Sequence, residues 1–246
     1  MADVRVITEL AGLQCRVLQE GDAKAKACVV LCHGFGAPGD DLVGLYGELM
    51  ESEPKLHGVR FVFPQAPLSL AALGYPPGSR AWWNIDFDEI QRLSAGDSAA
   101  MREFRKREPL GMPEARAAVL KLSQEVLQST GLPANKLVLG GFSQGAMITT
   151  DVALRLEEPP AALVTMSGTL LIEDVWRPKA IARRGLKVFQ SHGRQDPVLR
   201  FDAAQLLRDL YTQAGMRVDW HEFDGGHGIP LDVFRALGAF LVQTLG

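Results

Sequence analysis

Short apolar runs alternate with segments of helical periodicity along most of this chain, and no other feature of the sequence restricts the fold as strongly. Strands are predicted at 27–36, 59–67, 137–142, 162–168, 186–193 and 218–226. Helices are predicted at 40–50, 113–129, 143–150, 202–215 and 231–245. Strands separated by helices form a mostly parallel sheet that is covered by helices on both faces. The sequence therefore predicts an α/β fold of this kind.

The start of the chain predicts an edge of that sheet. Residues 5–10 and 14–19 have the character of two further strands, joined by a turn at Gly12. We expect them to pair as an antiparallel edge. The 246 residues contain no internal repeat and no linker, so one α/β domain is expected over 1–246.

Composition and charge exclude several classes of function. A net charge of −3 provides no basic field for nucleic acid. The N-terminus lacks the pattern of a signal peptide, and no run of 18 apolar residues predicts membrane insertion. The odd number of cysteines (Cys15, Cys28 and Cys32) argues against a disulfide framework, and no Cys/His cluster has metal-ligand spacing. We expect a cytoplasmic protein without metal or cofactor.

Residues 67–112 are the least regular part of the chain and combine aromatic, proline and charged residues. A long irregular stretch inside a compact domain is more often a lid or a binding segment than a spacer. We therefore expect residues 67–112 to form a lid-like or substrate-binding insertion. The basic run Arg102–Arg107 within it contains Glu103 and is followed by Glu108, so we interpret it as a solvated helix face and not as a surface for anions.

The stretch LVLGGFSQGAMITT (137–150) places Ser143 where a strand changes to a helix, with Gly141 and Gly145 two residues to either side. A G-x-S-x-G motif alone is a weak signal, because a serine that opens a helix is also an ordinary N-cap. Ligand sites, however, form at the carboxyl ends of parallel strands, and flanking glycines permit the sharp turn that exposes a nucleophile. The helix N-terminus also offers N–H groups to a developing oxyanion.

A serine nucleophile needs a base to take its proton and an acid to orient that base. Among the five histidines, His227 follows the last predicted strand and comes after Ser143, which fits the chain order of nucleophile, acid and histidine. For the acid, Asp196 follows the strand at 186–193 and is favoured by the same order. Asp224 is the competing candidate, although three residues before His227 it is better placed to shape a turn.

Six blocks of sequence share a family resemblance in their order and spacing: HGFGAPGDDL, FPQAP, AWWNID, GGFSQGAM, SHGRQDPV and FDGGHGIP. From about residue 27 to the C-terminus, the chain resembles the carboxylesterase, phospholipase and acyl-protein thioesterase family of α/β-hydrolases. The resemblance implies Ser143 as nucleophile, Asp196 as acid and His227 as base. It also implies two oxyanion donors, the backbone N–H groups of Gln144 and of Phe35, the latter where the family usually has a leucine.

The same resemblance bears on the surroundings of the triad. His33 resembles the family's loop-shaping histidine and not a second base. Trp82 matches a tryptophan beside the family's site and is followed by Trp83, although both could equally be core aromatics. We expect a pocket for an apolar acyl chain, lined by Leu68, Leu70, Leu73, Trp82, Trp83 and Ile229. Residues 86–111 look longer and more charged than in compact relatives, which leaves acyl-chain length and lid behaviour open.

The predicted function is that of a serine hydrolase that cleaves small or lipid-like carboxylic esters, with small or medium acyl chains, through an acyl-enzyme. An acyl-protein thioesterase or a lysophospholipase would use the same triad. A non-catalytic binding module on the same scaffold would be expected to have lost a triad residue. A membrane-surface lipase would use Ser69–Tyr75 as part of its lid. The sequence does not determine the oligomeric state.

Overall fold

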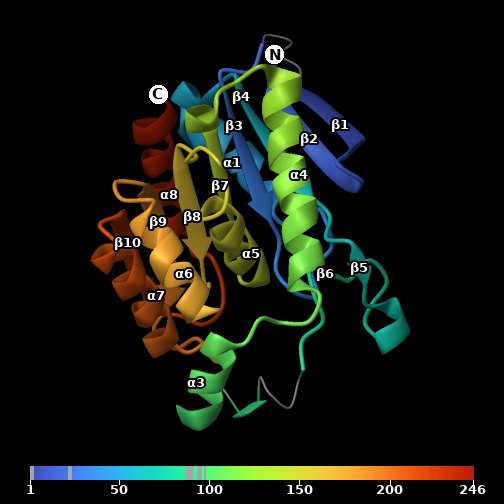
Figure 1. Cartoon of the computed structure of the whole chain (residues 1–246). Coiled ribbons are helices and arrows are strands. Elements are labelled where there is room, and N and C mark those ends of the chain that lie inside the picture. The colour runs from blue at the N-terminus through green and yellow to red at the C-terminus, as the bar shows by residue number, and fades with distance from the viewer. Residues whose placement is uncertain (1–2, 22–23, 87–90, 93–95, 97) are drawn as a thin grey trace.

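The computed structural model describes residues 3–21, 24–86, 91, 92, 96 and 98–246 (Figure 1). The strands in this part of the chain are β1 (Asp3–Leu10), β2 (Leu13–Glu20), β3 (Ala27–Cys32), β4 (Val59–Pro64), β5 (Leu68–Ser69), β6 (Arg80–Ala81), β7 (Leu137–Phe142), β8 (Ala162–Met166), β9 (Lys187–Gly193) and β10 (Arg217–Phe223). The α-helices are α1 (Gly44–Ser52), α3 (Ser98–Lys106), α4 (Met112–Thr130), α5 (Gln144–Ala153), α6 (Glu173–Ile181), α7 (Phe201–Gln213) and α8 (Leu231–Leu245). Short 3₁₀ turns are η1 (Pro54–Leu56), η2 (Ala71–Leu73) and η3 (Ala134–Lys136).

Eight of the strands form one twisted sheet in the order β1-β2-β4-β3-β7-β8-β9-β10. From β4 to β10 all neighbours are parallel, whereas β1 pairs with β2 and β2 with β4 in antiparallel register. The turn between β1 and β2 has positive φ at both Ala11 (55°) and Gly12 (81°), as a tight hairpin turn requires. The predicted parallel sheet with an antiparallel edge is confirmed.

Helices cover both faces of the sheet, and the sequence of β3 explains why. Every residue of this central strand is buried, and alternate side chains point to opposite faces. Cys28 and Val30 belong to the hydrophobic cluster on the face of α4, α5, α6 and α7. Val29 and Leu31 belong to the cluster on the face of α1 and α8. Figure 1 shows α4, α5 and α6 in front of the sheet, with α8 behind it.

Most helix boundaries follow local signals. α4 has Pro113 in its first turn and ends at Thr130, before Gly131, whose φ is 68°, within one residue of the predicted boundaries. α1 begins at Gly44, four residues later than predicted, because residues 40–43 form turns. α6 was not predicted. It contains Pro178 and buries only Trp176 and Ala180, so its pattern is too weak to be recognised in the sequence.

Part of the 67–112 insertion lies outside the described residues, at 87–90, 93–95 and 97. The rest is less irregular than predicted, since β5 and β6 form a two-stranded hairpin around η2 and Ser98–Lys106 form α3. Arg102 and Glu103 are exposed on α3, as a solvated helix face would be. Figure 1 shows the hairpin and α3 at the same end of the molecule, beyond the carboxyl ends of the parallel strands.

Candidate active site

Ser143 lies on a strained turn between β7 and α5, with φ of 53° and ψ of −118°. Residues with a side chain rarely adopt such backbone angles. A Cβ on Gly141 would lie 2.4 Å from the carbonyl oxygen of Cys32, and one on Gly145 would lie 1.9 Å from it. The turn therefore needs glycine at both positions. Within the described chain, the Ser143 hydroxyl caps no backbone N–H of α5, so helix capping does not explain the turn.

The loops after β9 and β10 bring Asp196 and His227 into contact. His227 Nδ1 lies 2.6 Å from Asp196 Oδ2, so we assign the ring proton to Nδ1, which donates to the carboxylate. The other carboxylate oxygen accepts the backbone N–H groups of Val198 at 2.8 Å and Leu199 at 2.9 Å. Both oxygens of Asp196 are thus held in place, and the ring keeps Nε2 available as a proton acceptor.

The electrostatics of Asp196 favour its ionised form. Burial alone would raise the pKa of this carboxyl, but the hydrogen bond from His227 and the two backbone N–H groups outweigh burial and hold the pKa below its usual value. The competing candidate, Asp224, is exposed and pairs with Arg194 at 2.9 Å. The carboxylate in contact with His227 is therefore that of Asp196.

A second histidine, which has no counterpart among the predicted site residues, supports the Asp196 loop. His192 is fully buried, and its Nε2 donates to the carbonyl oxygen of Leu199 at 2.7 Å while lying 3.3 Å from Asp196 Oδ2. Burial lowers the pKa of this ring, so it is neutral with its proton on Nε2. His192 therefore fixes the loop without adding a charge beside the carboxylate.

A pocket of about 780 Å³ opens over Ser143, and Phe35, Gln144 and His227 also line it. The ring of His227 packs against Phe142, with 4.8 Å between the centroids. No hydrogen bond joins Ser143 to His227 in the described structure. Such bonds are often long in an unliganded site and tighten when substrate binds.

The side chain of Gln144 connects the turn at Ser143 to the insertion. Its Oε1 accepts the backbone N–H of Trp82 at 2.8 Å, and its Nε2 donates to the carbonyl oxygen of Trp83 at 2.9 Å. Phe35, which also lines the pocket, packs edge-on against Tyr75, with 5.6 Å between the ring centroids. The two residues expected to donate oxyanion N–H groups are thus both anchored to residues 75–83.

His33 lies in the same loop as Phe35, and both of its ring nitrogens are engaged in hydrogen bonds. Its Nδ1 donates to the carbonyl oxygen of Gly34 at 2.8 Å, and its Nε2 accepts the backbone N–H of Ala66 at 3.1 Å. Its own carbonyl oxygen accepts the indole N–H of Trp82 at 2.9 Å. Burial lowers the pKa of this ring. His33 is therefore a neutral structural residue in this arrangement.

Comparison with known proteins identifies the family of this fold and site. Residues 13–245 match the family described as Phospholipase/Carboxylesterase. The chain belongs to this family of α/β-hydrolases. Its relatives include acyl-protein thioesterase 1 of Yarrowia lipolytica, 28% identical over 81% of this chain and 83% of that protein. Acyl-protein thioesterase 1 of Neurospora crassa is 27% identical over 91% of this chain and 89% of that protein.

Solved structures share this fold. The crystal structure of esterase PE8 superimposes with a TM-score of 0.77 at 27% identity, covering 94% of this chain and 99% of that one. A carboxylesterase from Mesorhizobium loti shares the fold, with a TM-score of 0.71 at 17% identity over 96% of this chain and 98% of that one.

The substrate-lining residues expected from the sequence fall in three different places. Trp83 lines the active-site pocket. Ile229 lines a second pocket of about 380 Å³ that also touches His227. The other four are not among the described residues that line the active-site pocket: Leu68, Leu70, Leu73 and Trp82.

Packing explains why those four residues do not line the pocket. Leu70 and Trp82 are buried in the protein interior, and the Trp82 indole is hydrogen-bonded to the loop of His33. Leu68 and Leu73 are 38% and 56% exposed on the β5–β6 hairpin and its η2 turn. In this member of the phospholipase/carboxylesterase family, other side chains therefore line the pocket over Ser143.

The structure adds pocket residues that were not predicted from the sequence, among them Phe104, Leu110, Met147, Val198 and Leu199. Two sequence signals were available. Met147 lies one helical turn after Ser143, and Val198 and Leu199 follow directly in the Asp196 loop. Phe104 and Leu110 come from the insertion and had no such signal, because only the fold brings α3 over the site.

Two further features concern the described part of the chain only. No three or more histidine, cysteine or carboxylate side chains gather there as metal ligands would. None of its helices has the length and apolar character needed to cross a bilayer.

Proposed function

We propose that Ser143 is the nucleophile of a serine hydrolase that cleaves carboxylic esters of small or medium acyl chains. The observation that carries this proposal is the strained φ of 53° at Ser143, on a turn that opens into the same pocket as His227. A strained backbone at a residue that caps nothing is typical of a functional site. The contact of His227 with Asp196 at 2.6 Å supplies the matching base and acid.

In the proposed reaction, His227 Nε2 takes the proton of the Ser143 hydroxyl as its oxygen attacks the ester carbonyl carbon. Asp196 keeps the other ring proton on Nδ1 and stabilises the imidazolium that forms. His227 then gives its proton to the leaving alcohol, and the acyl group remains on Ser143 as an ester. A water molecule, activated by the same ring, hydrolyses this acyl-enzyme and restores the serine.

The backbone N–H groups of Phe35 and Gln144 are the proposed donors to the oxyanion of each tetrahedral intermediate. Gln144 is the first residue of α5, where the helix presents free N–H groups and the positive end of its dipole. Both residues line the pocket. Loss of one such donor typically lowers kcat by about 10²–10³-fold.

Turnover of p-nitrophenyl esters from acetate to palmitate tests this proposal, with Ser143→Ala measured beside the wild type. We expect kcat/KM to fall to the uncatalysed background in the variant for every chain length. The chain length with the highest kcat/KM reports which acyl group the pocket prefers. Equal turnover by both proteins would contradict the proposal, because the serine would then be dispensable.

A second candidate is thioester cleavage on an S-acylated protein. Relatives over most of the chain carry the name acyl-protein thioesterase 1, and the same triad would serve because only the leaving atom changes from oxygen to sulfur. Hydrolysis of an S-palmitoyl peptide against the matched oxygen ester separates the two. A preference of tenfold or more for the thioester would favour this candidate, and the opposite preference would favour the esterase.

For its location we propose the cytoplasm. Cys15, Cys28 and Cys32 are all free and buried, as is usual for proteins of a reducing compartment. Fractionation of cells that express the full chain tests this, and recovery of the protein mainly from the secreted fraction would contradict it.

A further inference from the structure

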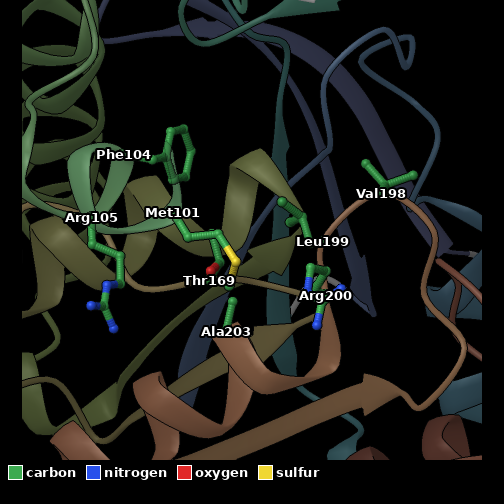
Figure 2. A pocket seen from close by; sticks show the side chains of 8 residues that line it. All are labelled: Met101, Phe104, Arg105, Thr169, Val198, Leu199, Arg200 and Ala203. Atoms are coloured by element: carbon green, nitrogen blue, oxygen red, sulfur yellow. The ribbon is translucent and has the colours of Figure 1, made fainter. Parts of the chain in front are cut away.

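A small chamber of about 20 Å³ lies between α3 and the first turn of α7 (Figure 2). Met101 of α3, Thr169 from the loop after β8 and Ala203 of α7 line it. A site must offer about 10–15 Å³ to hold a water molecule, so the chamber has room for one group of that size. It is separate from the triad, and nothing in the reaction described above uses it.

The chamber and the active-site pocket share Phe104, Val198 and Leu199 as lining residues. These three residues thus form part of the wall between the chamber and the active-site pocket. Leu199 is held in place, because its backbone N–H donates to the Asp196 carboxylate and its carbonyl oxygen accepts the ring Nε2–H of His192. Val198 is held in the same way, because its N–H also donates to Asp196, whereas Phe104 lies on α3, part of the insertion. Phe104 is therefore the shared wall residue that lies outside the Asp196 loop.

The chemistry of the chamber suits hydrocarbon. Its lining surface is mostly apolar, although two arginines contribute to it. The guanidinium of Arg200 lies 3.0 Å from Asp202, and that of Arg105 lies 3.9 Å from Glu173. Arg200 is thus neutralised by a hydrogen-bonded partner and can present its aliphatic stem, whereas the buried Nε of Arg105 has no hydrogen-bond partner among the described residues. Figure 2 shows Met101 and Ala203 between them, with Phe104 beyond Met101.

We propose that this chamber binds the terminal methyl group of the substrate's acyl chain, and that the chain passes Phe104 to enter it. The proposal rests on the acyl transfer by Ser143 proposed above. It assigns the α3 insertion a role in selecting acyl-chain length. Each methylene that moves from water to an apolar surface adds about fourfold in kcat/KM, so the selection can be measured.

The test is the chain length at which kcat/KM stops rising with each added methylene, here called the breakpoint. Phe104→Ala removes the partition and should move the breakpoint to longer chains by at least one carbon, with a gain of about fourfold on the longest esters for each added carbon. Ala203→Leu fills the chamber and should move the breakpoint to shorter chains. The double variant should follow Ala203→Leu, because a removed partition is of no use when the chamber behind it is full. Arg102→Ala, on the exposed face of α3, is the matched control and should keep the wild-type breakpoint.

Two results would overturn the proposal. The first is an Ala203→Leu protein that folds and keeps the wild-type breakpoint. The second is a double variant that keeps the longer breakpoint of Phe104→Ala. The longer breakpoint would then come from a wider active-site pocket and not from the chamber. If Ala203→Leu does not fold, Ala203→Val makes the same test with two added carbons in place of three.

A second readout keeps this inference distinct from the proposed function. Calorimetric titration of the wild type and the variants with saturated fatty acids of 6 to about 14 carbons measures the breakpoint in Kd without turnover. Turnover that survives in Ser143→Ala would refute the proposed function, and the titration would still decide on the chamber. Turnover that disappears in Ser143→Ala, with equal breakpoints in the other proteins, would refute the chamber alone.

Discussion

Replacement of Asp196 by asparagine removes the charge with almost no change in shape, so it isolates what the carboxylate does for His227. In the native protein, Oδ1 accepts the N–H groups of Val198 and Leu199, and Oδ2 accepts the N–H of His227 at 2.6 Å. An asparagine keeps the two backbone bonds only with its carbonyl oxygen turned towards them. Its NH₂ group then faces His227 Nδ1, and the ring must carry its proton on Nε2, where the base has to be free.

The expected effect is large because the wrong tautomer cannot accept the proton of Ser143. In Ser-His-Asp triads this exchange lowers kcat about 10⁴-fold, which corresponds to about 5.4 kcal/mol of activation free energy. We expect a loss of that size in p-nitrophenyl butyrate hydrolysis by Asp196→Asn. The matched control is Asp224→Asn, since Asp224 is exposed and pairs with Arg194, and it should stay within about threefold of wild type. A larger loss in the control than in Asp196→Asn would refute the assignment of the acid.

Stability provides two further predictions, on buried histidines and on the glycines of the turn. Burial lowers the pKa of His33 and of His192, so below about pH 6.5 the unfolded chain takes up protons that the folded chain does not. The free energy of unfolding should therefore fall between pH 7 and pH 5 by up to about 1.4 kcal/mol per pH unit for each ring. Urea unfolding of His192→Gln should show a free energy that depends less steeply on pH than that of the wild type. An equal pH dependence in the two proteins would exclude His192 as a cause of the acid destabilisation. Gly145→Ala places a methyl group 1.9 Å from the Cys32 carbonyl oxygen and should cost about 3 kcal/mol or more. Gly47→Ala on α1 meets nothing within 4 Å and should stabilise by up to about 1 kcal/mol, so equal melting temperatures for the two variants would contradict the tight turn.

The layered architecture is predictable because each buried strand has its own local signal. β3 and β7 are apolar throughout and are followed by glycine-rich turns, and such runs separated by amphipathic helices have few alternative arrangements. α6 is different. Its Pro178 opposes a helix prediction, and its position depends on Trp176, which is buried and donates to Asp151 at 2.8 Å. That contact joins segments 25 residues apart, and no local pattern reports it.

The candidate site divides in the same way. The turn at Ser143 is encoded locally, because the glycines that permit it are two residues to either side. The pocket wall is not encoded locally. Leucines of the 67–112 insertion were natural candidates for an acyl pocket, yet Leu68 and Leu73 remain exposed, while Phe104 of the same insertion lines the pocket. The fold of the insertion decides which of its apolar side chains reach the distant site. The hydrophobic periodicity of the sequence does not specify this fold.

The most direct test of the central claim is the mass of the intact protein after reaction with a fluorophosphonate, a reagent that forms a stable adduct with an activated serine. We predict that one equivalent adds to the wild type, that peptide mapping locates it on Ser143, and that neither Ser143→Ala nor His227→Ala is labelled at a comparable rate. An adduct on another residue, or equal labelling of wild type and Ser143→Ala, would contradict the assignment of Ser143 as the nucleophile.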